Sequence, residues 1–96
     1  MRRFIKKKIL VPFADAILSR EKTFEIRKND EGYQKGDVLV FTVMDTEHFE
    51  NPTHPLNGKE YEITYVLSGW GIENGYVALG IVPRIIEAEE GEEDDI

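Results

Sequence analysis

The chain has 96 residues, of which 41% are hydrophobic; it contains no cysteine and carries a formal net charge of −7. That length suffices for one domain with a thin core, because a domain of this size buries only about 60–65% of the surface that its unfolded chain exposes. The lack of cysteine excludes a disulfide framework and a thiolate metal site. The sequence also has no run of the roughly 18 apolar residues that a membrane-spanning helix needs.

The first ten residues are basic, like the start of an export signal. No apolar segment of about 7–15 residues follows them, because Lys6, Lys7 and Lys8 interrupt the apolar positions. We therefore expect a cytoplasmic, monomeric protein without membrane contact.

The charge is distributed unevenly along the chain. Residues 85–96 hold seven acids and no base, whereas residues 1–84 hold 12 of each. Within that body, residues 1–36 carry ten bases against five acids, and residues 37–84 carry two bases against seven acids. The sequence therefore predicts a folded domain over residues 1–84 with a basic face, followed by a disordered acidic tail over residues 85–96.

The first elements are a strand and a helix. Residues 4–10 alternate like a strand, and three consecutive lysines within it are typical of an edge strand. Pro12 fits the first turn of a helix over residues 12–20. The helical period places four residues on one face of that helix: Phe13, Ala16, Ile17 and Arg20.

Four more strands follow, at residues 23–28, 38–44, 61–67 and 76–82. In the first of these, Phe24 and Ile26 share one face, and Thr23, Glu25 and Arg27 share the other. Residues 38–44 form the most apolar run and predict a central strand.

The connections are rich in turn-forming residues. Residues 29–36 and 45–59 are predicted to be polar loops, and Gly69 and Gly71 place Trp70 in a further loop. One early helix and about five strands indicate an α+β domain with a small mixed or antiparallel barrel.

The segment from Lys22 to Asp30, KTFEIRKND, resembles the motif of ASCH domains, which is usually Gly-x-Lys-x-x-Glu-x-Arg. It is more similar to a small ASCH-like subfamily of bacterial and phage domains of unknown function, in which an aromatic residue and a Gly-Asp turn follow, here Tyr33 and Gly36-Asp37. The resemblance covers residues 8–82 and implies a PUA-like barrel with a cleft beside the motif.

Two positions depart from that pattern. Arg20 replaces the glycine of the motif, so the corner between helix and strand must close without it. The subfamily often begins with His-Glu-Leu-Lys, and this chain has the segment IKKK at residues 5–8 instead.

The resemblance implies that the cleft binds RNA or a nucleotide, which can be a modified one. Lysine and arginine can meet phosphates, Glu25 can accept from the exocyclic amine of cytosine or adenine, and exposed Tyr33 and Trp70 rings can stack on unpaired bases. We predict no catalytic residue and no cofactor. The predicted binding residues are Lys22, Thr23, Glu25, Arg27, Lys28, Asp30, Tyr33 and Trp70.

Simpler interpretations remain open for the same residues. Glu25 and Arg27 are two apart on one strand face, which also fits a surface ion pair of little energetic consequence. Trp70 can instead cover the core as a lid, with its ring packed against apolar side chains. Lys6, Lys7 and Lys8 also fit a solvated guard on an edge strand.

An enzymatic interpretation is a nucleoside amidohydrolase of the ASCH type. Some bacterial ASCH proteins hydrolyse acylated cytidine with a lysine and a threonine nucleophile of the motif. Glu25 stands at the position of that threonine, and Thr23 would project from the face opposite Lys22. We therefore expect no hydrolysis by threonine attack.

Two further classes are a metal site and a protein-interaction module. The loop at residues 45–59 carries five potential ligands, but their spacing fits no compact metal motif, so we predict no metal: Asp45, Glu47, His48, Glu50 and His54. An interaction module would use the acidic tail or an edge strand, and no sequence feature names its partner.

Overall fold

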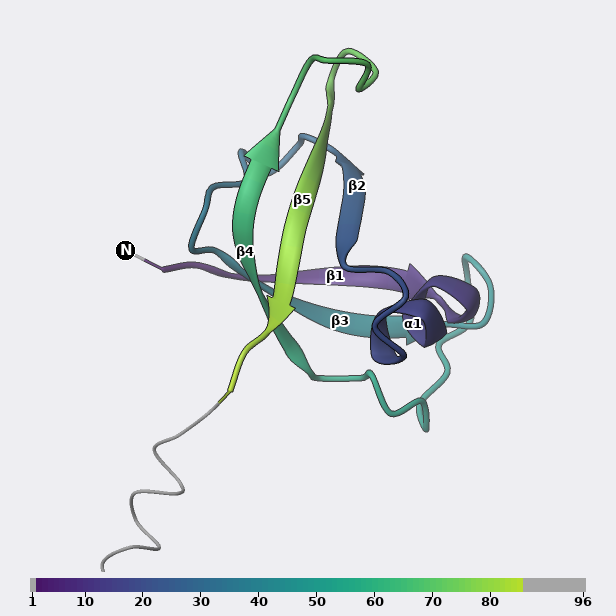
Figure 1. Ribbon diagram of the computed structural model, residues 1–96. Coiled ribbons are helices and arrows are strands. Elements are labelled where there is room, and N and C mark those ends of the chain that lie inside the picture. Colours follow the sequence, from purple (N-terminus) through teal and green to yellow (C-terminus); the bar gives the residue numbers. More distant parts are fainter. Residues whose placement is uncertain (1, 86–96) are drawn as a thin grey trace, which may run out of the picture.

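The computed structural model describes residues 2–85 (Figure 1). The predicted disorder of the acidic tail falls, from residue 86 onward, outside the described residues. The elements in chain order are β1 (Phe4–Leu10), α1 (Val11–Leu18), β2 (Phe24–Lys28), β3 (Val38–Met44), β4 (Glu60–Leu67) and β5 (Tyr76–Pro83).

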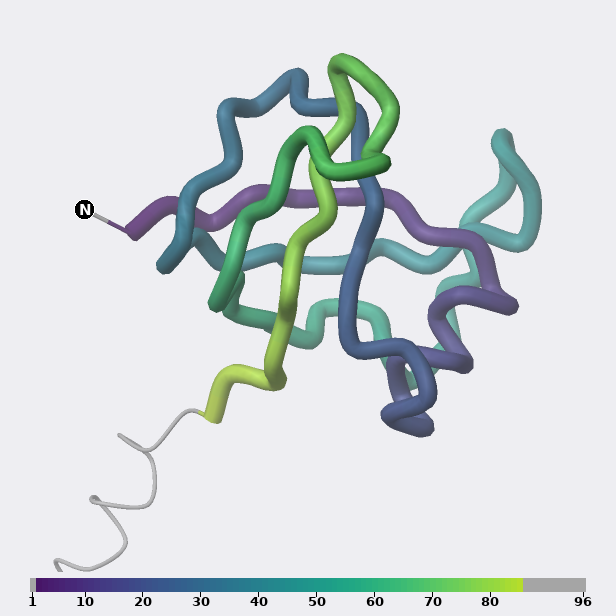
Figure 2. The backbone as a smooth tube through the Cα atoms, turned by 45° about the horizontal axis from the view of Figure 1, so that its top comes forward, coloured from purple at the N-terminus to yellow at the C-terminus, as the bar shows by residue number. Residues whose placement is uncertain are grey.

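The five strands form one mixed sheet in the order β1-β3-β4-β5-β2. The β1–β3 pair is parallel, and the other three pairs are antiparallel. The sheet curls into a half-barrel, with β1 and β2 as its two edges (Figures 1 and 2). The prediction of a small α+β domain with one helix and about five strands is confirmed, as is the edge position of β1.

The core fills the concave side of the sheet. Phe41 on β3 is 1% exposed, and its ring centroid lies 5.7 Å from that of Tyr61 on β4. Alternate residues of the other strands complete this layer, including Ile5 and Ile9 of β1 and Leu79 of β5. The inner position of β3 between two strands agrees with its continuous apolar sequence.

The helix differs from the prediction in its ends and in its buried face. It runs from Val11 to Leu18, and the buried residues are Ala14 and Ile17, whereas Phe13 is 51% exposed. Each helical residue is rotated by about 100° from the last, so the packing of Ala14 against the sheet turns Phe13 outward.

The corner after the helix closes through Arg20 at a positive φ of 70°, the left-handed region that glycine favours. The backbone N–H of Arg20 donates to the carbonyl of Ile17 at 3.1 Å, and that of Lys22 donates to the carbonyl of Ala16 at 3.0 Å. Glycine adopts this conformation without strain, which explains why the motif has a glycine at this position. For Arg20 the conformation costs about 1–2 kcal/mol.

A buried carboxylate connects the start of β1 to the loop at residues 29–36. Asp37 is 3% exposed and accepts from the Arg3 guanidinium at 2.6 and 3.3 Å and from the Gln34 N–H at 2.9 Å. The hydrogen bond from Arg3 holds the pKa of Asp37 below its ordinary value of 3.8. The charged form of Asp37 is therefore stabilised in the folded state.

We expect Asp37→Asn to lower the free energy of unfolding at pH 7, and the loss to shrink as pH falls below about 4. The pKa of Asp37 is lower in the folded state than in the unfolded state, so the unfolded chain takes up the proton first as the pH falls. The stabilisation by the charged carboxylate is therefore lost as the pH falls through the folded-state pKa. Urea unfolding at pH 7, 5 and 3 measures this, with the exposed Glu73→Gln as the control. A difference from the parent that does not change with pH would contradict it.

Candidate functional site

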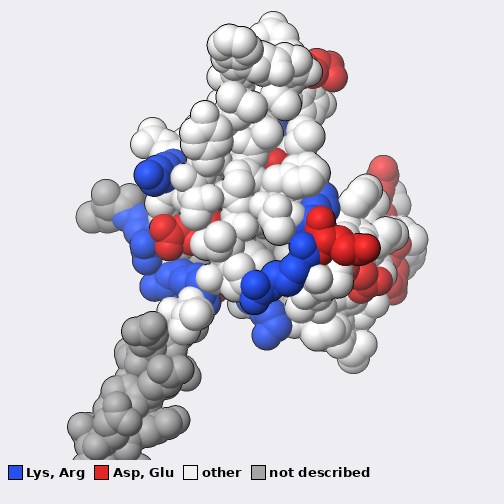
Figure 3. All heavy atoms as spheres, viewed as in Figure 1, with Lys and Arg blue, Asp and Glu red and all other residues white. Residues whose placement is uncertain are grey.

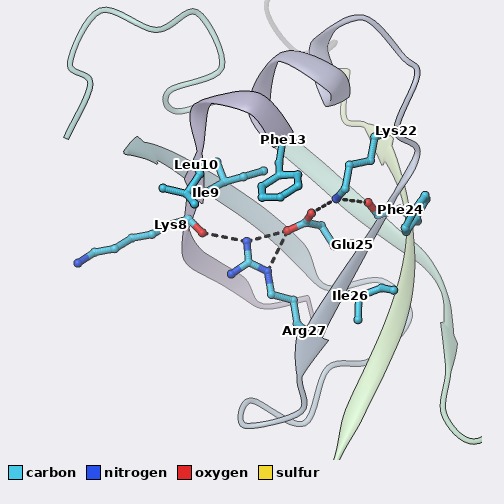
Figure 4. Close-up of a pocket in the computed structure, with 9 residues that line it drawn as sticks. All are labelled: Lys8, Ile9, Leu10, Phe13, Lys22, Phe24, Glu25, Ile26 and Arg27. Carbon is cyan, nitrogen blue, oxygen red and sulfur yellow. Dashed lines mark hydrogen bonds and ion pairs between the residues drawn. The ribbon is translucent and has the colours of Figure 1, made fainter. Parts of the chain in front are cut away.

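A cleft of about 410 Å³ opens in the seam of the half-barrel, between β1 and α1 on one side and β2 on the other (Figure 4). The strand β2 contributes its central residues, and the corner before it contributes Lys22. The lining residues are Lys8, Ile9, Leu10, Phe13, Lys22, Phe24, Glu25, Ile26 and Arg27.

Glu25 lies at the centre of this cleft between two cations. Its Oε2 accepts from Arg27 Nε at 2.9 Å, its Oε1 pairs with the Lys22 ammonium, and Figure 4 shows the carboxylate between the two groups. The Glu25 side chain is 5% exposed, whereas those of Lys22 and Arg27 are 18% and 22% exposed. The predicted ion pair of Glu25 and Arg27 is therefore confirmed, but its placement at the surface is wrong, because the carboxylate is buried and faces the interior of the half-barrel.

One of the two cations, Arg27, also forms a hydrogen bond across the seam. Arg27 donates from one terminal nitrogen to the Lys8 carbonyl at 2.9 Å, which connects β2 to β1. The Lys22 ammonium donates to the Phe24 carbonyl at 2.7 Å. These bonds satisfy backbone carbonyls on both edge strands of the half-barrel.

Apolar side chains surround the charged group. The Lys22 ammonium lies 5.1 Å from the centroid of the Phe24 ring and 5.8 Å from that of Phe13. Leu10, which is 38% exposed, lies on the other side of the Phe13 ring in Figure 4. Such cation–aromatic contacts are favourable, and the rings exclude water from part of the cleft.

The other predicted binding residues lie elsewhere. Tyr33 is 5% exposed and belongs to the core, so the prediction of an exposed stacking ring is wrong there. Burial raises the pKa of Tyr33, and Lys7 lies 5.7 Å from its ring centroid. Asp30 is 3.7 Å from Lys7, in an ion pair. The aromatic residue of the motif thus contributes to packing of the loop at residues 29–36.

Three more of these residues are exposed outside the cleft lining: Thr23, Lys28 and Trp70. Trp70 is 91% exposed at a φ of 55° in the loop between β4 and β5. The interpretation of Trp70 as a core lid is therefore wrong. Only Lys22, Glu25 and Arg27 of the predicted set come together in the cleft.

The sequence did not reveal the wall formed by β1 and α1. The sequence pattern places Leu10 in a strand and Phe13 on one face of a helix. It gives no sign that either residue lies beside the motif. The sequence gives no sign that Phe13 is exposed, because its exposure depends on how the helix packs against the sheet.

The loop at residues 45–59 packs against the helix through His54. The imidazole Nε2 lies 2.7 Å from Asp15 Oδ1, and Nδ1 accepts from the Leu56 N–H at 3.1 Å. Between residues 2 and 85, no group of three or more His, Asp or Glu side chains is placed to hold a metal ion. None of the helical residues in this range forms a segment long and apolar enough to span a membrane.

A model of a protein family described as a domain of unknown function, DUF3850, matches residues 6–81. The chain belongs to the DUF3850 family. A search of curated proteins gives no match. All nine residues that line the cleft fall within the matched DUF3850 segment, so the cleft belongs to the DUF3850 domain itself.

Proposed function

We propose that the cleft of this DUF3850 domain binds a nucleotide, either free or as an unpaired residue of RNA. One observation carries the proposal: a buried carboxylate and two cations lie together inside a cleft whose other lining residues, apart from Lys8, are apolar. We further propose that the half-barrel is of the PUA-like type that the ASCH resemblance implies, with the Lys-x-x-Glu-x-Arg motif at its open seam.

The size and the walls of the cleft suit a planar base. A volume of about 410 Å³ lies within the range of about 300–1,000 Å³ that is typical of small-molecule sites. The Phe13 and Phe24 rings offer apolar contacts to a flat ligand. Stacking of a base on an aromatic side chain contributes about 1–3 kcal/mol.

The charged groups suit the polar edge and the phosphate of a nucleotide. A carboxylate has about four acceptor positions, and Lys22 and Arg27 do not fill all of those on Glu25. The free positions can accept from the exocyclic amine of cytosine or adenine. The three groups together carry one net positive charge, which favours an anionic ligand.

Binding is better supported than hydrolysis. The described residues that line the cleft include no serine, threonine or cysteine, and Thr23 is exposed outside it. A covalent mechanism needs a nucleophile next to the bound substrate. The lining of the cleft offers a carboxylate, an ammonium and a guanidinium instead.

We expect a titration with CMP, AMP, UMP and GMP to shift the backbone amide resonances of residues 8–13 and 22–27. In Glu25→Gln, the preference for CMP and AMP over UMP should fall about 5- to 100-fold, because the uncharged amide accepts the exocyclic amine less well. Lys59→Ala, an exposed lysine outside this cleft, is the control. Amide shifts elsewhere in the domain, or no saturable shifts with any nucleotide, would overturn the proposal.

A further inference from the structure

The outer face of β2, β5 and β4 is apolar and exposed. Alternation turns Phe24 and Ile26 of β2 outward, with exposures of 45% and 53%, and Figure 4 shows both pointing away from Glu25. On the neighbouring strands Tyr76 is 36% exposed and Tyr65 is 63% exposed. Figure 3 shows the middle of this face as largely uncharged, with Lys and Arg as well as Asp and Glu side chains at its margins.

In this face β5 carries two small residues, Ala78 and Gly80, between larger side chains of its two neighbours, and we call this strip the groove. Phe24 pairs with Gly80, which in turn pairs with Tyr65 on β4. In the next row, Ile26 pairs with Ala78, which pairs with Leu67. The middle strand therefore has no large side chain where its neighbours carry rings and branched chains, and the groove lies between two apolar walls.

A shift of register in β4 puts Tyr65 on this wall. The pairing of β4 with β5 slips between Ile63 and Tyr65, so that Tyr65 faces outward opposite Gly80 and Val66 turns toward the core. A Cβ at Gly80 would lie 3.2 Å from Thr64 Oγ1, which is a tight contact, and 3.6 Å from the Cβ of Tyr65, which is an ordinary one. The bulge therefore turns the Tyr65 ring outward beside Gly80, where β5 carries no side chain.

One end of the groove is cationic and aromatic. Lys28, the last residue of β2, pairs with Tyr76 at the start of β5 and is exposed. Among residues 2–85, no carboxylate forms an ion pair with it. Trp70 lies in the loop that joins β4 to β5 and presents nearly its whole surface.

The groove and the cleft are separated by β2 alone. Phe24 and Ile26 line the rim of the cleft and also form one wall of the groove, while Glu25 and Arg27 of the same strand face the cleft. We propose that an unpaired RNA strand with one nucleotide in the cleft continues across β2 into this groove, where its bases stack on Tyr65, Tyr76 and Trp70 and Lys28 contacts a phosphate.

The proposal rests on the proposed function of the cleft and extends it from one nucleotide to a strand. Exposed rings with a nearby unpaired cation are the combination that single-stranded nucleic acids require. Continuity with a cationic cleft favours a strand that uses both sites over a protein partner of the apolar face.

The test compares a fluorescein-labelled single-stranded RNA hexamer of mixed sequence with AMP and CMP. The hexamer should bind at least about tenfold more tightly than either mononucleotide. Tyr65→Ala and Trp70→Asn should each weaken hexamer binding about 5- to 100-fold, and Lys28→Ala should also flatten its salt dependence. All three should leave mononucleotide binding within about twofold of the parent.

Phe49→Ala is the matched control, because Phe49 is a 69% exposed ring in the loop between β3 and β4. Equal binding of hexamer and mononucleotides, or unchanged hexamer binding in the Tyr65 and Trp70 variants, overturns the strand proposal and leaves the cleft proposal standing. Hexamer binding that depends on Tyr65 without any mononucleotide binding overturns the cleft proposal and, with it, the path of the strand from the cleft across β2. If the protein self-associates in sedimentation, and Tyr65→Ala abolishes this association without changing the RNA affinity, the outer face binds a second copy of the chain and the strand proposal is overturned.

Discussion

A chain that carries Lys22→Met, Glu25→Leu and Arg27→Met together is expected to fold nearly as stably as the parent and to lose nucleotide binding in the cleft. The three side chains form one charged group, in which the Glu25 carboxylate is buried and the two cations are partly exposed. Replacement of a whole buried ion-pair group by apolar residues of similar volume is often neutral or stabilising, because the cost of removing charges from water disappears. Binding should fail because no polar group remains to orient the nucleotide.

The single variant Arg27→Ala, unlike the triple variant, is expected to be clearly less stable than the parent. It leaves Glu25 with one cation and removes the bond to the Lys8 carbonyl across the seam. We expect a loss of about 2–3 kcal/mol in the free energy of unfolding, at or below the low end for a broken buried pair because Arg27 is partly exposed.

Urea unfolding and a CMP titration of both variants measure these effects. A triple variant that is less stable than Arg27→Ala would show that the charged group stabilises the fold more than apolar packing can. A triple variant that binds CMP like the parent would place the nucleotide site elsewhere.

Replacement of Phe41 by alanine should have the largest effect on stability. Phe41 is 1% exposed on β3 and packs against Tyr61 on β4. A buried Phe→Ala change costs about 3–5 kcal/mol through lost transfer energy and the cavity that remains. The total stability of a domain is typically about 5–15 kcal/mol, so the variant should unfold at much lower urea concentration or be partly unfolded in water.

The control for this prediction is Phe49→Ala, which removes the same atoms from an exposed site. Its free energy of unfolding should stay within about 0.5 kcal/mol of the parent value. Equal effects of the two substitutions would contradict the placement of the core on the concave side of the sheet.

The elements of the fold could be predicted because local patterns specify them. The apolar run at Val38–Met44 indicated a central strand, and the three lysines of β1 indicated an edge. The face of the helix was predicted wrongly, because Phe13 and Ala14 fit neighbouring helical stripes equally well and only the packing against the sheet selects Ala14.

The site could be predicted only in part, for a related reason. Lys22, Glu25 and Arg27 share a short segment with a recognisable spacing, so the sequence identified them together. Tyr33 was predicted on the surface, because a tyrosine in a polar loop carries no sign of burial in its own segment.

The sequence by itself determined the elements, the motif and the concentration of basic residues in the first 36 positions, because these follow from neighbours along the chain. Only the tertiary structure decided that β2 becomes the second edge of the curled sheet and faces β1 across the seam, with the Glu25 carboxylate inside this seam and Phe24 outside it. Strand order and curl depend on pairings between distant segments, such as β2 with β5, and those pairings decide which face of β2 is buried.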